Sequence, residues 1–459
     1  MIRAIVTIFT VPDLRKKILF TLGMLLLFRV GAHITVPGLD FKVLHDYFSK
    51  AAGGGQSGNL TDYIDLFAGG AFKRLSVFAL GIMPYISASI IMQIMMVAVP
   101  SLQRLAKEGD FGRKKINQYT RYGTVLLCAL QAYGITVYIT SLHFEAQQGG
   151  KGMLIAGGPG FNFTAMTMLT ITAGTILLMW MGELITERGI GNGTSLIIFA
   201  GIIAGAPAAL GQFLGDIRSN QADAILALIL LILFIAMIGM SILLSEGQRK
   251  IPLQYGKRIV GRRMVQGASQ TLPIKVNAAN VMPIIFASSL MIFPSQIASY
   301  FGSRYQGFAE TIQKYLAPGT LTYFIIYILL ILFFAYFYTT IQYNPKEIAE
   351  ALKKNGGYIP GVRPGAHTEE TLERILNRIT LSGAIFLAFV AIAPDIFIKL
   401  WSLEKYSQLI HLFGGTSLLI TVGVALDTLK QIESQLIMRH YDGFMDRSKK
   451  GAGRPRAVR

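Results

Sequence analysis

The sequence has little cysteine, because Cys128 is the single one in 459 residues. A disulfide within the chain requires two cysteines, so none can form. Cys128 lies in an apolar run, where a cysteine usually behaves as a small buried hydrophobic residue. We therefore expect no redox or thiol chemistry.

Charged residues are also scarce, at 15% of the chain against 52% for hydrophobic residues. A soluble protein of this length needs more polar residues to cover its surface, so the composition indicates that lipid surrounds most of the chain. The net charge of +18 would suggest a nucleic-acid partner for a soluble protein. In a membrane protein the distribution of that charge along the chain is more informative.

Catalytic sequence motifs are missing too. The chain contains no His-Glu-x-x-His zinc motif, no Gly-x-Ser-x-Gly nucleophile elbow and no Gly-x-x-x-x-Gly-Lys-Ser/Thr phosphate loop. The apolar runs contain no plausible pair of a nucleophile and a base for an intramembrane enzyme. We therefore expect no enzymatic activity, no metal, no cofactor and no small-molecule substrate.

Long hydrophobic runs are the main feature that is present. A helix that crosses a bilayer needs about 20 mostly apolar residues. We predict an all-α integral membrane protein with ten transmembrane helices, near Ile18 to Val36, Leu75 to Val99, Tyr122 to Thr140, Ala165 to Ile185, Thr194 to Leu214, Ala222 to Leu244, Val281 to Ile297, Thr320 to Ile341, Ile375 to Ala393 and Leu409 to Leu429.

Basic residues are unequally divided between the segments that join these windows. With the N-terminus in the cytoplasm, 31 of the 43 Lys and Arg residues fall in cytoplasmic segments and 10 in external ones. Membrane proteins carry an excess of Lys and Arg on the cytoplasmic side, so this count predicts that both ends are cytoplasmic. We expect residues 1–17 to form an amphipathic stretch without a removable signal peptide, and residues 430–459 to form a basic tail.

One segment between the first two windows is too short to cross the membrane. Residues 59–70 follow a glycine run and place apolar residues at helical spacing beside acidic ones. Two interpretations fit this segment: a re-entrant helix surrounded by protein or a water-filled cavity, and an amphipathic helix on the outer membrane surface. The residues concerned are Leu60, Asp62, Ile64, Asp65, Phe67, Gly69 and Gly70.

Two long cytoplasmic loops have internal structure. Residues 245–279 alternate polar and apolar residues and turn near Arg262 and Arg263, which predicts a protruding hairpin. Residues 342–374 hold a short helix with Asn344 as its cap and Pro345 at its first position, and after it a turn rich in proline and glycine around Arg363. Arginine binds phosphate and carboxylate, so these loop tips are candidates for docking on RNA, on an acidic protein or on anionic lipid headgroups.

Ionisable residues within the windows or near their ends are few. We interpret them as snorkelling or paired, because a proton or ion pathway would need more of them. Glycine-rich residues 187–193 predict a hinge that packs two helices closely. A multi-span secondary transporter remains an alternative, since broken helices and glycine hinges also occur in transporters. The ionisable residues are Arg29, Glu183, Glu187, Arg378 and Asp427.

The second window contains a pattern that fits a channel. Ile82 and Ile86 are four residues apart and share one helix face, and Pro84 is expected to loosen the backbone between them. A ring of such branched side chains from several helices would exclude water and ions and still deform around a passing polypeptide.

Several motifs resemble those of the SecY family, whose members are the central subunit of the bacterial protein-export channel. The segment from Phe78 to Ile91 resembles one family signature, and the segment from Ile185 to Gly193 with Ser195 resembles another. Similar stretches recur along essentially the whole chain, at residues 36–40, 284–289, 344–347, 359–365 and 414–419.

The resemblance implies two pseudo-symmetric halves, residues 18–214 and 215–429, around a central pore that a re-entrant plug helix at residues 59–70 closes. Thr194 departs from the apolar choice expected in the pore ring, and we expect its hydroxyl to bond a backbone carbonyl one turn earlier. The ring implied by the resemblance is Ile82, Ile86, Thr194, Ile198, Ile285 and Ile420.

The resemblance also implies a lateral gate between the second and seventh helices, held closed by hydrogen bonds of polar side chains. Such a channel would pass unfolded secretory polypeptides across the bacterial plasma membrane and release signal sequences and transmembrane segments into lipid. Arg262, Arg263 and Arg363 would receive the ribosome or the SecA ATPase, and SecE and SecG would be partner subunits. The implied gate residues are Ser87, Gln93, Gln131, Asn280, Ser288 and Phe293.

Overall fold

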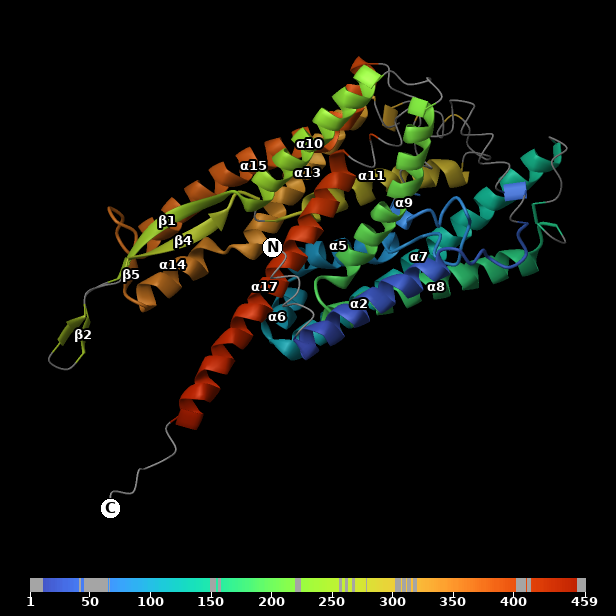
Figure 1. The fold of residues 1–459 in the computed structure, drawn as a ribbon. Coiled ribbons are helices and arrows are strands. Elements are labelled where there is room, and N and C mark those ends of the chain that lie inside the picture. Colours follow the sequence, from blue (N-terminus) through green and yellow to red (C-terminus); the bar gives the residue numbers. More distant parts are fainter. Residues whose placement is uncertain are drawn as a thin grey trace.

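The protein is predominantly helical in the computed structural model (Figure 1). The all-α fold class predicted from the sequence is confirmed. The structure describes residues 11–40, 43–44, 65, 67–148, 154–155, 158–218, 224–255, 258–260, 263–265, 269–277, 279–301, 307, 311, 315–316, 320–401, 410 and 414–451.

Every predicted apolar window overlaps a long helix. These helices are α2 (Pro12–Gly31), α5 (Met83–Ala98), α7 (Asp110–Gln148), α8 (Phe161–Arg188), α9 (Gly193–Arg218), α10 (Ala224–Glu246), α11 (Met282–Phe301), α13 (Leu321–Gln342), α15 (Ala366–Leu400) and α17 (Gly415–Gly451). Two shorter helices, α6 (Pro100–Lys107) and α14 (Pro345–Lys354), lie between them in the sequence.

Length and hydropathy identify the helices that can cross a membrane. Within the described residues six helices qualify, and α5 with α6 adds a pair that is bent by 100°. The chain is therefore a multi-pass membrane protein, and the number of ten crossings stays a prediction.

The second predicted span begins later than expected. Residues 71–82 form successive turns and a bridge, and helix α5 starts only at Met83. Pro84 lies in the first turn of α5, where its missing N–H has no helical partner to lose, so it starts the helix and does not loosen one. Ile82 is the residue before the helix, and its carbonyl accepts the N–H of Ile86 at 3.1 Å, which keeps the two side chains one turn apart.

The connection between α8 and α9 ties distant helices together. The N–H of Ile190 donates to Thr21 Oγ1 of α2 at 3.1 Å, and the N–H of Gly191 donates to Gln431 Oε1 of α17 at 2.8 Å. A Cβ on Gly193 would lie 1.9 Å from the carbonyl oxygen of Gly182, so only glycine fits there. The predicted close packing at this glycine-rich connection is confirmed, and its role as a hinge stays a prediction.

The two long loops that the sequence predicts to be cytoplasmic fold together into a small layer. Strand β1 (Gln248–Tyr255) pairs antiparallel with β4 (Ser269–Lys275) and with β5 (Gly357–Tyr358) of the other loop, in the order β4-β1-β5. A second ribbon joins β2 (Arg258–Val260) to β3 (Arg263–Val265), which confirms the predicted hairpin. Helix α14 begins at Pro345 as predicted, although the side chain of Asn344 makes no capping hydrogen bond.

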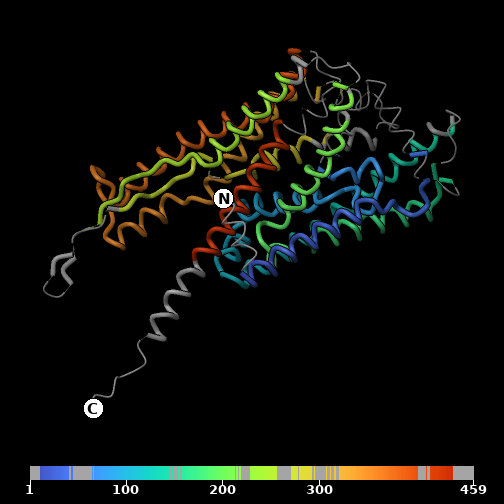
Figure 2. Tube along the Cα trace, in the orientation of Figure 1, coloured from blue at the N-terminus to red at the C-terminus, as the bar shows by residue number. Residues whose placement is uncertain are grey.

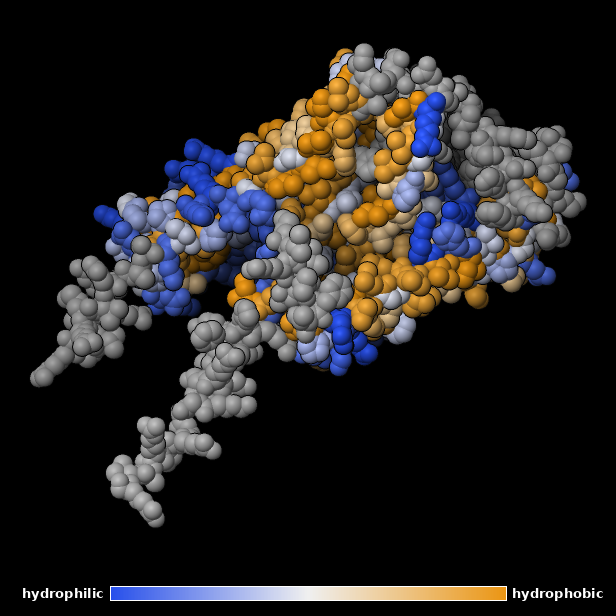
Figure 3. Space-filling view, in the orientation of Figure 1, coloured by the Kyte–Doolittle hydropathy of each residue, from blue (hydrophilic) through white to orange (hydrophobic). Residues whose placement is uncertain are grey.

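This layer has its own apolar core. Ile251, Leu253 and Ile274 of the strands pack with Leu352 of α14 and Leu372 near the start of α15. Helix α15 therefore extends beyond the membrane-spanning bundle and carries the layer at one end of the molecule (Figure 1). Hydrophilic residues gather at that end, whereas hydrophobic residues cover the helices (Figure 3).

The long helices pack around one main core. Helices of the N-terminal part lie on one side and those of the C-terminal part on the other (Figure 2). The two parts meet where α5 and α7 pack on α11 and where α9 packs on α17.

Candidate pore and lateral gate

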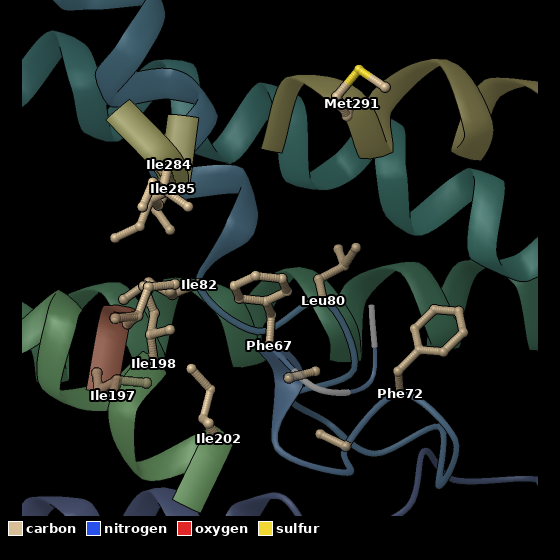
Figure 4. Close-up of a cluster of buried hydrophobic side chains, with 14 of the residues drawn as sticks. Phe67, Phe72, Leu80, Ile82, Ile197, Ile198, Ile202, Ile284, Ile285 and Met291 are labelled. Atoms are coloured by element: carbon tan, nitrogen blue, oxygen red, sulfur yellow. The ribbon is translucent and has the colours of Figure 1, made fainter. Parts of the chain in front are cut away.

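The predicted apolar ring residues lie in one buried core. Ile82, Ile86, Ile198, Ile285 and Ile420 are each at most 6% exposed, although they come from the start of α5 and from α9, α11 and α17. In the close-up view, the side chains of Ile284 and Ile285 are directed toward those of Ile82 and Ile198 (Figure 4). Four separate helices thus contribute branched side chains to this core.

Thr194 also lies beside this group. A Cβ on Gly182 of α8 would lie 3.3 Å from Thr194 Cγ2 and 3.6 Å from Ile82 Cδ1, which places the threonine methyl next to the ring. Its hydroxyl donates to Asn192 Oδ1 at 2.7 Å. The predicted bond to a carbonyl one turn earlier is wrong, because Thr194 lies in the first turn of α9 and no helical turn precedes it.

A cavity of about 560 Å³ ends at these residues. Ile86, Thr194, Ile198 and Ile285 line its apolar part. Its polar part is lined by Tyr85, Ser89, Gln93, Asn117, Arg121, Glu183, Thr186, Glu187, Asn192 and Ser195, and by parts of α11 and α13. The cavity, called the vestibule below, thus has polar side chains on one part of its wall and branched apolar side chains on another.

One bidentate ion pair lies on the wall of this vestibule. Arg121 of α7 donates to both carboxylate oxygens of Glu183 of α8, at 2.6 and 2.9 Å. This fork geometry satisfies both partners and holds α7 against α8. Glu183 is therefore paired, as the interpretation of the span-end charges predicted.

Helices α5 and α11 are in contact, so the seam of the predicted lateral gate is closed. Ser289 Oγ of α11 donates to Met83 Sδ of α5 at 3.6 Å. Gln93 of α5 hydrogen bonds to Ser89 at 3.3 Å and to Tyr338 of α13. Among the described residues, the hydrogen bond from Ser289 to Met83 is weak, because its acceptor is a thioether sulfur.

The other predicted gate residues occupy varied positions. Ser87 is half-buried on α5, and Gln131 is buried on α7 with no hydrogen-bond partner for its Oε1 among the described residues. Ser288 donates to the carbonyl of Ile285 in its own helix at 3.0 Å. Asn280 donates to Asp427 of α17 and so turns toward that helix. Phe293 lies on α11, and its side chain is outside the described residues.

Sequence reasoning missed three residues at the seam: Met83, Ser289 and Tyr338. The sequence did offer a signal for Ser289, because it follows another serine, Ser288. Neighbouring positions on a helix face different directions, so either serine was a candidate for the contact with α5. Nothing in the sequence distinguishes Met83 or Tyr338 from ordinary core residues.

The predicted plug is described only at its C-terminal end. Phe67 is 6% exposed in the main core, and the backbone adopts positive φ at Gly69 (+69°) and Gly70 (+82°). Asp65 Oδ1 accepts the N–H of Lys73 at 2.9 Å. This end lies inside the protein, as the re-entrant interpretation expects. Leu60, Asp62 and Ile64 lie outside the described residues.

The structure describes the three arginines of the basic loop tips to different extents. Arg363 is exposed in a turn between Gly361 (φ +82°) and Gly365 (φ +108°), and its carbonyl accepts the hydroxyl of Thr368 at 2.9 Å. Arg263 belongs to β3, and its side chain is not among those described, whereas Arg262 lies outside the described residues.

The remaining span-end charges form no relay in the described part of the chain. Arg29 donates to the carbonyl of Gly69 at 2.7 Å, and Asp427 accepts from Asn280. Arg378 and Glu187 are exposed. Among the described residues no group of three or more His, Cys, Asp or Glu side chains could hold a metal ion.

Comparison with known proteins identifies the family. The SecY family model matches residues 76–429. The protein translocase subunit SecY of Aquifex aeolicus (strain VF5) is 44% identical over 442 residues, which cover 96% of this chain and 98% of the relative.

Solved structures share the fold at lower identity. A protein-conducting channel matches with a TM-score of 0.63 at 19% identity and covers 92% of this chain and 93% of its own. Sec61 in the canine ribosome-channel complex from the endoplasmic reticulum matches with a TM-score of 0.60 at 18% identity, with the same coverage. The secondary-transporter alternative finds no support in these matches. The extent of the family match and the identity to a full-length relative establish that the chain belongs to the SecY family.

Proposed function

We propose that this protein translocation channel conducts unfolded polypeptides from the polar vestibule through a pore ring formed by Ile82, Ile86, Thr194, Ile198, Ile285 and Ile420. The observation that carries the proposal is the cavity that ends on branched apolar residues from separate helices. Branched apolar side chains hold no water or ions between them and still shift to admit a larger chain.

The lateral gate would open between α5 and α11. Interhelical hydrogen bonds in membranes contribute only about 0.6 kcal/mol each, so the apolar helix of a signal sequence can replace the contact between Ser289 and Met83. Of the predicted gate residues, Ser87 and Gln93 lie on α5, Gln131 on α7, and Asn280, Ser288 and Phe293 at or on α11. Transmembrane segments would leave the channel through this seam into lipid.

Two hinged halves would make that opening possible. Residues 18–214 and 215–429 form the halves, and their contacts at α5 with α11 and at α9 with α17 lie on different helix pairs. A separation at α5 and α11 could therefore leave the pair of α9 and α17 together. Residues 1–17 and 430–459 would be the cytoplasmic ends, in a bacterial plasma membrane.

Partner proteins would supply the energy for translocation, because the sequence has no phosphate loop that could bind a nucleotide. The tips with Arg262, Arg263 and Arg363 fit an RNA or acidic surface, so the ribosome and the SecA ATPase are the proposed partners there. The solved Sec61 channel is part of a ribosome-channel complex, which supports this assignment. SecE and SecG would complete the membrane complex.

A gate-locking experiment tests the proposed function. In a Cys128→Ala background, we would place cysteines at Met83 and Ser289, whose side-chain atoms approach to 3.6 Å, and join them with a short thiol-reactive crosslinker. We expect crosslinking to abolish export of a signal-bearing protein into vesicles, because the signal sequence could no longer part α5 from α11.

The matched control pairs Met83→Cys with Leu290→Cys, since Leu290 follows Ser289 but is 47% exposed and faces away from the core. The control channel should still export the signal-bearing protein after treatment with the crosslinker. Undiminished export through the channel crosslinked at positions 83 and 289 would contradict the lateral-gate proposal.

A further inference from the structure

Arg29 is the charged residue that the pore and gate leave without a role. It lies half-buried near the C-terminal end of α2, within the first apolar window. A cation is favourable at a helix C-terminus, so its presence there alone needs no further explanation. However, its Nη1 donates to the carbonyl of Gly69, forty residues further along the chain, at 2.7 Å. A charge-assisted hydrogen bond in a low-dielectric interior is stronger than a neutral one.

The acceptor belongs to the C-terminal end of the proposed plug, and that end also contacts α9. A Cβ on Gly69 would lie 2.8 Å from Gly201 Cα, and a Cβ on Gly201 would lie 3.2 Å from the carbonyl oxygen of Phe67. The two backbones are thus in direct contact. The plug end therefore contacts both the guanidinium of Arg29 on α2 and the backbone of α9 at Gly201.

Other charges surround the same position. Asp65 and Arg74 lie close enough to Arg29 to interact with it electrostatically. Asp65 also accepts the N–H of Lys73 at 2.9 Å, and the N–H of Gly70 donates to the carbonyl of Asp65 at 3.0 Å. These bonds tie Asp65 to Gly70 and Lys73, so Gly69 lies in a hydrogen-bonded turn close to Phe67.

We propose that Arg29 is the positioning residue that anchors the plug in the closed channel. Its bond to Gly69 presses the plug end against Gly201 and keeps Phe67 packed beside Ile82 and Ile202 (Figure 4). A polypeptide that enters the pore displaces the plug by breaking this bond. The inference rests on the proposed function, since it assigns the closing of that same pore to one side chain.

Ion leak through the full-length channel complex in vesicles is the first test. Arg29→Gln removes the charged donor, and we expect the leak of the idle channel to rise about tenfold, the effect of losing one hydrogen bond to a charged group. Arg29→Lys keeps a donor and should leak less than Arg29→Gln. Lys16→Gln removes an exposed cation from the same helix and should leave the leak unchanged.

A second variant tests the same anchor from α9 without touching Arg29. Gly201→Ala places a methyl group against the plug backbone and should raise the leak, whereas Gly211→Ala in the same helix should not, because no atom lies within 4 Å of its Cβ. This pair keeps the proposal testable if Arg29→Gln fails to assemble.

Thiol labelling separates anchoring from general stability. Ala68 is 3% exposed, so a cysteine there, in a Cys128→Ala background, should react slowly with a membrane-impermeant maleimide. We expect Arg29→Gln to speed this reaction while the unfolding temperature of the complex stays unchanged.

Two results would overturn the proposal: a leak of Arg29→Gln equal to that of Lys16→Gln, or unchanged labelling at position 68 with a lowered unfolding temperature. If removing residues 59–70 raises the leak but Arg29→Gln does not, the anchoring role of Arg29 is wrong and the proposed channel function stands. If export also survives the gate crosslink, the proposed function itself fails.

Discussion

At the scale of single residues, Asn192 holds Thr194 and the start of α9 in place through hydrogen bonds. Its Oδ1 accepts the N–H of Thr194 at 3.1 Å and the hydroxyl of Thr194 at 2.7 Å. It therefore caps the first turn of α9 and at the same time satisfies the one hydroxyl among the proposed ring residues. A threonine whose hydroxyl is occupied in this way presents its methyl group to the ring.

We expect Asn192→Ala to lower the free energy of unfolding by about 1 kcal/mol, because a helix N-cap is lost. Denaturant unfolding of the purified channel in mild detergent measures this change. Asn117→Ala is the matched control, since Asn117 lines the same vestibule and is exposed. Equal destabilisation by both substitutions would contradict the capping role.

At the scale of elements, the late start of α5 gives the pore its shape. Residues 71–82 are turns, so the chain enters the core as a non-helical segment and places Ile82 at its end. Non-helical backbone at membrane depth is tolerated only inside protein or beside water. Phe67 of the proposed plug thus lies close along the chain to Ile82 and Ile86, two of the proposed ring residues.

Deleting residues 59–70 should therefore raise the ion leak of reconstituted channels and largely preserve export, because the ring residues of α9, α11 and α17 remain. Conductance and export would be measured on the same vesicles. A deletion variant that leaks no more than the parent channel would rule out the plug assignment.

At the scale of the whole molecule, the layer carried by α15 has a core of its own, apart from that of the long helices. Its core of Ile251, Leu253 and Leu372 is distinct from the main core, so substitutions at its tips should leave the membrane bundle intact. The exposed turn around Arg363 is held by its backbone, through Thr368. A change in the arginine side chain therefore leaves the turn in place.

We expect Arg262→Glu, Arg263→Glu and Arg363→Glu each to weaken binding of ribosomes or SecA, and the loss to shrink at high salt, because screening reduces the attraction in the parent channel. Cosedimentation and surface binding assays measure this. Arg374→Glu is the control, since Arg374 is exposed on α15 and pairs within its own helix with Glu370 at 3.1 Å. Parent-like binding by all three variants would refute the docking role.

Much of the architecture was accessible to sequence reasoning because the signals are local. A run of about 20 apolar residues predicts a helix whatever its neighbours are, and each predicted window does overlap one. The hairpin follows from the alternation of polar and apolar residues along the chain, and the helix that begins at Pro345 follows from its first proline. Both are local signals too. Where Pro84 was misjudged, the error arose because a proline that starts a helix and one that bends it look alike until the helix boundary is known.

What the sequence determined by itself was the membrane environment, the helices and the motifs of the family, since these depend on composition and on neighbours along the chain. Only the tertiary structure decided which distant groups meet: Asn280 with Asp427, Met83 with Ser289, and Arg29 with the carbonyl of Gly69. Partners separated by forty or more residues are chosen by the packing of whole helices, and no local pattern encodes that choice.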